Sequence, residues 1–470
     1  MNSTALKDYI STFWDNEILP TLCDYIRIPC VSPLFDDEWK SRGFMDAAIN
    51  LFVTWAEEKI IKLSGATIDV LHEPGRTPLI FIDVPGKTKE TVLLYGHLDK
   101  QPETSGWSEG LGPWTPVIKS SKLYGRGSAD DGYAMFAALS ALLALEAHNL
   151  PHARCVIVIE AAEESGSFDM PFYMERLKDR IGAVDLVICL DSGAGTFDRL
   201  WLTTSLRGLV AGTLKVSVLN NGQHSGQVSG IVPSSFRILR MLLSRIEDEA
   251  TGEIKLPSAF VKVPSERMRQ IEVTAEILGN SVFSDIPFSG NTKPMVSTPV
   301  EMILNQTWKP QLAVVAFDGY PKPENAGNVL LPYTRAKLSM RIPPCCDGIA
   351  IAHALKQELE KNPPYDSDVS FELQAERSGW NAPTFCPWLE EALNRASSTH
   401  FGKPAAFIGE GGSINFMVLL SEKFPQAQFI VTGVCGPDSN IHGADENLDI
   451  SVAKRLSACI AEILAIQASR

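Results

Sequence analysis

The sequence predicts an α/β protein whose mostly parallel sheet is flanked by helices, with a smaller α+β domain inserted in the chain. Four short apolar runs, typical of buried strands, indicate the sheet. They are residues 91–95, 155–159, 186–190 and 428–431. A helical stretch at residues 132–147 lies between the first two runs, as expected when helices cover such a sheet.

The inserted domain is indicated by a change in the pattern of elements near residue 207. Residues 209–218 alternate as a half-buried strand, and a stretch of helical spacing follows at residues 233–246. The same order of strand and helix recurs at residues 336–361, and a further strand is expected at residues 369–375. Two strand–helix units with extra strands make a small α+β domain.

The main domain is expected to resume after residues 378–385, because the Gly, Asn and Pro of this segment, SGWNAPTF, are typical of a linker. We therefore divide the chain into a main domain in two parts, residues 1–206 and 379–470, and an inserted domain, residues 207–378.

The composition fits a soluble protein with two cores, because 45% of the 470 residues are hydrophobic and 21% are charged. A net charge of −14 disfavours nucleic acid and anionic membranes as partners. Neither a signal peptide nor a run of about 18 apolar residues is present, which predicts a cytoplasmic protein. The nine cysteines form no CxxC pair, which favours reduced thiols over disulfides or a Cys-bound zinc.

Five potential metal ligands follow one another along the chain, and most of them stand where a predicted strand ends. In an open α/β sheet the carboxyl ends of the strands border the ligand crevice, so one crevice could collect all five groups. The pattern predicts a hydrolase with two metal ions. The five residues are His97, Asp130, Glu164, Asp191 and His442.

The first ligand candidate, His97, belongs to a GHLD motif at the end of a strand. A lone histidine is more often a hydrogen-bonded structural residue than a ligand. Asp99, two residues further on, favours the metal role, because its carboxylate can accept the other imidazole N–H and make the metal-binding nitrogen more basic.

Two adjacent acids stand at the entrance to the predicted helix in the motif GRGSADDG. Either Asp130 or Asp131 could cap the helix, which needs only a short acceptor side chain. Two acids are more than a cap requires, and a carboxylate at this place can bridge two cations with its two oxygens. We therefore favour Asp130 as a bridging ligand.

A pair of glutamates, Glu163 and Glu164, follows the strand at residues 155–159. They could form a solvated surface pair, or one could bind metal while the other removes a proton from a metal-bound water and later protonates the leaving amine. Asp191 offers another oxygen ligand, although an Asp at a strand end is most often a turn former. His442 lies in a loop rich in Gly, Asn and Asp, and its position alone decides nothing.

Several motifs together give the sequence a family resemblance. GHLD, YGRGSADDG, AAEESGS, the HSG at residues 224–226, MRIPP, GEGGSI and NIHGADE occur in this order over most of the chain. The sequence thereby resembles the aminoacylase and carnosinase superfamily of dizinc metallopeptidases, most closely the carnosinase-like cytosolic non-specific dipeptidase family. This resemblance implies a zinc-exopeptidase-like catalytic domain and an inserted lid and dimerisation domain.

The resemblance also implies roles for individual residues. His97 and Glu164 would hold one metal ion, His442 and Asp191 the other, and Asp130 would bridge them. Asp99 would orient His97, and Glu163 would be the general base.

Further implied roles concern the substrate. His224 of the inserted domain would reach the partner subunit's active site, where an imidazole can stabilise an oxyanion. Arg341 would bind the terminal carboxylate of the substrate with its charged, planar guanidinium group. Gly411, Gly412 and Ser413 would bind the same carboxylate. Without the resemblance, these residues could equally be a loop histidine, a surface arginine and a plain turn.

One departure from the family pattern is Gly132, which stands where relatives usually have a lysine after the paired aspartates. The support that this lysine gives the nearby carboxylates is then absent or supplied elsewhere. At the Asp191 position, peptide-cleaving relatives tend to have Asp and deacylases tend to have Glu, so the resemblance favours peptide cleavage.

The expected function is a dinuclear metal-dependent exopeptidase, a homodimeric dipeptidase that hydrolyses short peptides. Zinc is the expected metal, with manganese or cobalt as alternatives, because selectivity among them depends on geometry and supply. One alternative is an amidohydrolase that removes an acyl or carbamoyl group from an amino acid. A degenerate binding protein of the same fold is the other alternative, and the complete set of ligands and base disfavours it.

Overall fold

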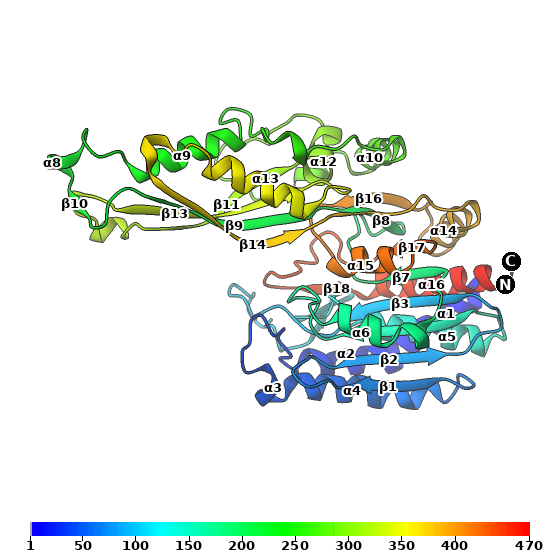
Figure 1. The fold of residues 1–470 in the computed structure, drawn as a ribbon. Helices are drawn as coiled ribbons and strands as arrows, with labels where there is room; N and C mark the ends of the chain where they lie inside the picture. The colour runs from blue at the N-terminus through cyan, green and yellow to red at the C-terminus, as the bar shows by residue number, and fades with distance from the viewer. Residues whose placement is uncertain (1, 285) are drawn as a thin grey trace. The chain divides into compact units, whose positions relative to one another are not determined.

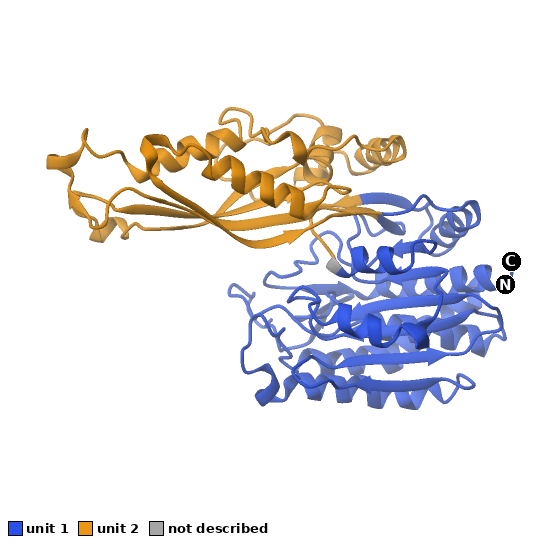
Figure 2. Ribbon diagram, viewed as in Figure 1, with its two compact units in different colours: residues 1–203, 382–408, 415–470 blue, residues 204–381, 409–414 orange. Residues whose placement is uncertain are grey.

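The computed structural model of the chain describes residues 2–284 and 286–470, which form two compact units (Figures 1 and 2). Unit 1 comprises Met1–Thr203, Ala382–Ile408 and Asn415–Arg470. Unit 2 comprises Thr204–Asn381 and the short segment Gly409–Ile414. Among the described helices, none combines the length and the apolar character needed to cross a membrane.

Unit 1 is built around a six-stranded, mostly parallel sheet, which confirms the predicted fold class. Four neighbouring strands, from β6 to the edge strand β17, run parallel, whereas β2 is antiparallel to the strands on both its sides, β1 and β6. In spatial order the strands are β1 (Thr67–Leu71), β2 (Leu79–Val84), β6 (Arg154–Glu160), β3 (Thr91–His97), β7 (Leu186–Cys189) and β17 (Gln428–Val431).

The central strands are buried because helices cover them, as their unbroken apolar sequences predict. All seven residues of β3 are buried. The covering helix α5 (Ala134–Ala147) is apolar around its whole circumference, and it packs between the sheet and the long C-terminal helix α16 (Ile450–Ala468). Further helices of unit 1 are α1 (Ser3–Phe13), α2 (Leu19–Ile26), α3 (Trp39–Arg42), α4 (Phe44–Ile60), α6 (Met170–Arg176), α7 (Lys178–Ile181), α14 (Pro387–His400) and α15 (Asn415–Lys423).

Unit 2 contains an antiparallel four-stranded sheet with helices α9 (Ser235–Ile246) and α13 (Gly348–Glu360) packed together against it. Its strands alternate, so that even-numbered residues of β13 are buried and odd-numbered ones are not. In spatial order the strands are β11 (Gln311–Asp318), β13 (Tyr333–Ile342), β9 (Gly208–Ser217) and β14 (Asp368–Arg377).

Three further helices of unit 2 share a smaller apolar cluster that contains Ile271, Ala275, Ile303 and Trp308. These helices are α10 (Ser265–Leu278), α11 (Ser281–Ser284) and α12 (Pro299–Thr307). A separate two-stranded ladder pairs β10 (Gln223–His224) with β12 (Val329–Leu330), and the short helix α8 (Ser225–Val228) follows β10.

The interpretation of residues 378–385 as a plain linker is wrong in part. Within this segment β15 (Trp380–Asn381) pairs with β8 (Trp201–Leu206), and β16 (Ala406–Glu410) lies on the other side of β8. Trp380 is only 3% exposed. Burial of this indole stabilises the short strand, although the Gly, Asn and Pro residues around it are typical of a turn. A second small sheet consists of β18 (Asn447–Asp449), β5 (Lys122–Tyr124) and β4 (Val117–Lys119).

Candidate metal centre

The parallel strands of unit 1 bring the five ligand candidates to one edge of the sheet. His97 is the last residue of β3, Glu164 follows β6, and Asp191 follows β7. Asp130 lies in the loop before α5, and His442 lies in the loop between β17 and β18. Because the strands β6, β3 and β7 are parallel neighbours, their carboxyl ends meet at the same edge.

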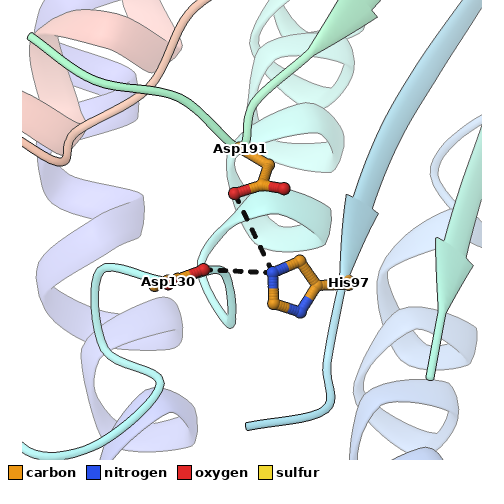
Figure 3. Close-up of side chains that lie close together, drawn as sticks. All are labelled: His97, Asp130 and Asp191. Carbon is orange, nitrogen blue, oxygen red and sulfur yellow. Dashed lines mark hydrogen bonds and ion pairs between the residues drawn. The ribbon is translucent and has the colours of Figure 1, made fainter. Parts of the chain in front are cut away.

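A first group of three ligand atoms joins His97, Asp130 and Asp191 (Figure 3). The Nε2 atom of His97 lies 3.1 Å from Oδ1 of Asp130 and 3.9 Å from Oδ1 of Asp191. His97 is buried, and its other ring nitrogen, Nδ1, lies 3.0 Å from the backbone oxygen of Asp99. With an N–H on Nδ1, Nε2 faces the two carboxylates as an acceptor that can bind a cation.

A second group joins Asp130, Glu164 and His442. The Nε2 atom of His442 lies 2.9 Å from Oδ2 of Asp130 and 3.4 Å from Oε2 of Glu164. Asp130 therefore belongs to both groups, with Oδ1 directed at one histidine and Oδ2 at the other. This is the arrangement of a carboxylate that can bridge two cations.

The pairing of ligands differs from the one that the family resemblance implies. His97 clusters with Asp191, and His442 clusters with Glu164, whereas the resemblance would pair His97 with Glu164. In both arrangements Asp130 is the shared group.

The electrostatics of the site fit a divalent-metal centre. Burial, reinforced by Asp191, raises the pKa of Glu163 well above its usual value. Burial and the neighbouring Asp130 do the same to the pKa of Glu164. The pKa of Asp130 is lowered although burial alone would raise it, because His442 and His97 hydrogen-bond to its carboxylate. Crowded buried acids need positive charge, and carboxylate oxygens with imidazole nitrogens are ligands for zinc, manganese or cobalt.

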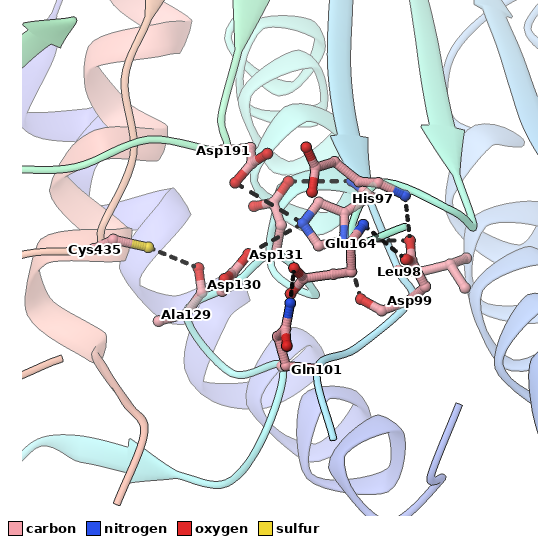
Figure 4. A network of polar contacts seen from close by, with 12 residues as sticks. His97, Leu98, Asp99, Gln101, Ala129, Asp130, Asp131, Glu164, Asp191 and Cys435 are labelled. Atoms are coloured by element: carbon pink, nitrogen blue, oxygen red, sulfur yellow. Dashed lines mark hydrogen bonds and ion pairs between the residues drawn. The ribbon is translucent and has the colours of Figure 1, made fainter. Parts of the chain in front are cut away.

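The carboxylate of Asp99 holds the glutamate pair in place. Its Oδ1 accepts the backbone N–H of Glu163 and its Oδ2 that of Glu164, each at 3.1 Å. Figure 4 shows Asp99 beside Glu164. The Asp99 carboxylate also lies 3.5 Å from Nδ1 of His97. Asp99 thus connects the imidazole to the loop after β6, in addition to the role of orienting His97 that the sequence suggests.

Three positioning residues escaped the sequence interpretation. Gln101 donates from Nε2 to Oε2 of Glu164 at 2.6 Å. Arg126 and Glu446 form a buried ion pair at 2.7 Å. Oε1 of Glu446 accepts N–H groups of the loop that carries Asp130, and Arg126 donates to the carbonyl oxygens of His442 and Gly443. The pair thereby joins the loops of two ligands.

A sequence signal for the ion pair existed. Arg126 and Glu446 are part of the same GRGSADDG and NIHGADE motifs that carry the ligands. What the motifs do not reveal is that these two charges, 320 positions apart, meet in the protein interior.

The surroundings of Gly132, which stands where the family pattern has a lysine, leave no room for a side chain. A Cβ atom at this position would lie 2.1 Å from Cε1 of Tyr25 and 2.6 Å from the backbone oxygen of Gly127. Tyr25 is fully buried, and its hydroxyl donates to the backbone oxygen of Leu98 at 2.8 Å. The tyrosine ring therefore occupies the space that any side chain at position 132 would need.

Apart from Glu163, the residues that are predicted to contact the substrate belong to unit 2. Arg341 lies on β13, the exposed His224 lies on β10, and Gly411, Gly412 and Ser413 lie in the segment after β16. Their roles toward the metal ligands of unit 1 remain predictions.

The comparisons with known proteins agree with the site. The profile of peptidase family M20/M25/M40 matches residues 93–465. The cysteinylglycine-S-conjugate dipeptidase of Corynebacterium striatum is 24% identical over 417 residues, covering 86% of this chain and 87% of the relative. The Cys-Gly metallodipeptidase dug1 of Schizosaccharomyces pombe is 24% identical over 389 residues, covering 77% of each chain.

Among solved structures, human carnosine dipeptidase 1 shares the fold, with a TM-score of 0.76 at 21% identity and coverage of 100% of this chain and 99% of that one. The chain belongs to peptidase family M20/M25/M40. This membership confirms the predicted relationship to the carnosinase-like peptidases and the predicted class of enzyme, a metallopeptidase.

The packing around Gly132 leads to a first prediction. Gly132→Ala should lower the free energy of unfolding by about 1–3 kcal/mol, because the methyl group must displace the Tyr25 ring or the backbone of Gly127. Urea unfolding measures this change. Gly112→Ala is the matched control, since a Cβ there would meet Thr115 at an ordinary 3.5 Å. Equal stability of the two variants would contradict the packing argument.

Proposed function

We propose that this protein is a dinuclear metal-dependent dipeptidase, with Asp130 as the bridging ligand. The observation that carries the proposal is that the two oxygens of Asp130 face two different histidines, each with a further carboxylate beside it. Relatives named as dipeptidases support the choice of a short peptide as the substrate.

In this proposal His97, Asp130, Glu164, Asp191 and His442 hold two divalent ions, with zinc as the expected metal. Two such ions would polarise the scissile carbonyl and lower the pKa of an attacking water. The protein's own contribution is a set of ligands that is fixed before binding by Asp99, Gln101 and the Arg126–Glu446 pair.

Glu163 is the proposed general base. Its backbone is fixed by Asp99, and its carboxyl group has a raised pKa because of burial and Asp191. A carboxylate that is ready to hold a proton can take one from the attacking water and hand it to the leaving amine nitrogen.

The substrate is proposed to be a short peptide with a free terminal carboxylate, which Arg341 and residues 411–413 would hold. Arg341 is half-buried on β13, and burial together with Arg377 lowers the pKa of its guanidinium. A cation that is partly removed from water and repelled by another cation favours an anionic ligand.

The proposed assembly is a cytoplasmic homodimer formed through unit 2. Its support is the edge strand β11, whose outer side pairs with no other strand in the described residues. Val314, Val315 and Phe317 on this strand are exposed, and Phe317 packs against the exposed rings of Phe236 and Tyr320. An unpaired apolar edge is suited to pairing with a second copy of itself.

The bridging ligand leads to a prediction about metal content. The purified protein should bind two divalent ions per subunit, and chelation should abolish hydrolysis of dipeptides. Asp130→Ala should lose both ions and activity, because both ligand groups include Asp130. Elemental analysis and a dipeptide assay check this. Full activity of metal-free protein, or two ions retained in Asp130→Ala, would refute the proposed centre.

The two glutamates should separate into different roles. Glu163→Gln should keep the metal but lower kcat by about 10²–10⁴-fold, because the amide keeps the shape and loses the basic oxygen. Glu164→Gln should lower metal occupancy. Steady-state kinetics with metal analysis of both variants tests the assignment, and the opposite pattern would show that the roles are reversed.

The dimer is tested by mixing two inactive variants, His224→Ala and Glu163→Gln. If His224 completes the partner's site, a mixed dimer has one site with both defects and one with neither. With free exchange about half the dimers are mixed, so activity should return to about a quarter of wild type. Exchange is verified with differently tagged subunits. Absence of recovery after proven exchange would mean that His224 does not act across the interface.

A further inference from the structure

Arg207 of unit 2 is a buried cation that has no acidic partner among the described residues. It follows β8 and is 9% exposed. Its guanidinium donates to two backbone oxygens, that of Gly411 at 3.2 Å and that of Asn305 at 3.4 Å. Within the described part of the chain, no carboxylate lies at ion-pair distance from it. Burying a charge in this way is costly unless a ligand supplies the missing anion.

A second guanidinium adds to the positive charge at this place. Burial, followed by the repulsion of Arg341, lowers the pKa of Arg207 to about 10, so Arg207 stays charged at neutral pH. Arg341 is in turn opposite Leu209 on β9, and Leu209 is opposite Arg377 on β14. Arg207 and Gln311 line one pocket, and Gln311 is directly opposite Arg341 on the neighbouring strand, so the two arginines lie in the same region of unit 2. Two guanidinium groups gathered in this way make a site suited to a carboxylate.

The segment after β16 approaches Arg207 closely. A Cβ atom at Gly411 would lie only 2.9 Å from Nη2 of Arg207. Because glycine has no Cβ atom, the backbone of this segment can lie close to the guanidinium without displacing it. The loop that the family resemblance assigns to carboxylate binding is therefore in contact with Arg207.

An apolar pocket of about 490 Å³ in unit 2 also includes Arg207 in its lining. Gln311 lines it as well, and this residue is directly opposite Arg341 on the neighbouring strand. Much of the remaining lining is apolar and exposed to solvent, notably Met295 at 66%, Ile286 at 51% and Phe288 at 37%. Exposed apolar side chains gathered around a buried cation suit a ligand that has both an apolar part and a negative charge.

We propose that Arg207 binds the terminal carboxylate of the peptide substrate together with Arg341, and that the adjoining pocket receives an apolar side chain of that terminal residue. The inference rests on the proposed dipeptidase function for the identity of the ligand. It goes further by adding a second cation to the carboxylate site and by naming the class of preferred substrate, peptides that end in a residue such as leucine.

The test measures equilibrium binding to metal-free full-length protein by calorimetry, so that no peptide is hydrolysed. The probes are Gly-Leu, Gly-Gly and Gly-leucinamide. Gly-Leu should bind at least about tenfold more tightly than Gly-Gly because of its apolar side chain. Gly-leucinamide should lose about tenfold or more because it lacks the charged oxygen. Equal affinity for Gly-Leu and Gly-Gly would overturn the pocket assignment.

Two variants separate the parts of the site. Arg207→Gln should weaken Gly-Leu and Gly-Gly by a similar factor, about tenfold or more, because both carry the carboxylate. Met302→Trp, which narrows the pocket, should weaken Gly-Leu and spare Gly-Gly. The control is Arg335→Gln, which removes the same charge from an exposed site on β13 that is paired with Asp318. Unchanged affinities in both Arg207→Gln and Met302→Trp would overturn the proposal.

Failure of the proposed function gives a different result. If metal-loaded protein hydrolyses no dipeptide while the metal-free protein shows the predicted binding differences, the dipeptidase assignment is wrong and the binding site stands. If dipeptides are hydrolysed and the Arg207→Gln variant has wild-type KM and wild-type affinity, the binding site alone is wrong.

Discussion

The sharing of the Asp130 carboxylate between two histidines is the contact on which the proposed metal centre depends. One carboxylate oxygen lies 3.1 Å from Nε2 of His97 and the other 2.9 Å from Nε2 of His442. The two imidazoles come from distant parts of the chain, so this carboxylate fixes the separation of the two ligand groups.

That arrangement requires support, because it concentrates buried acids at the edge of the sheet. The support comes from hydrogen bonds that tie the ligand loops together. Asp99 holds the backbone of the glutamate pair, and the Arg126–Glu446 ion pair joins the Asp130 loop to the His442 loop. A ligand set held in this way would lose little conformational freedom on binding metal.

Much of this could be predicted from the sequence, because strands and ligands leave local signals. Apolar runs located the four parallel strands, and the acids and histidines at their ends identified all five residues that cluster. Contacts between distant residues could not be predicted in the same way. The pairing of His97 with Asp191 and the filling of the space at Gly132 by Tyr25 depend on tertiary packing. The short strand at Trp380 was missed because its Gly, Asn and Pro neighbours are typical of a turn.

The central claim is that one aspartate bridges two metal ions, and anomalous diffraction from crystals of the metal-loaded protein tests it most directly. Two anomalous peaks per subunit are expected, about 3.5–4 Å apart and on either side of the Asp130 carboxylate. One should lie beside His97 and Asp191, and the other beside His442 and Glu164. A single peak, or two peaks that do not share Asp130, would contradict the account.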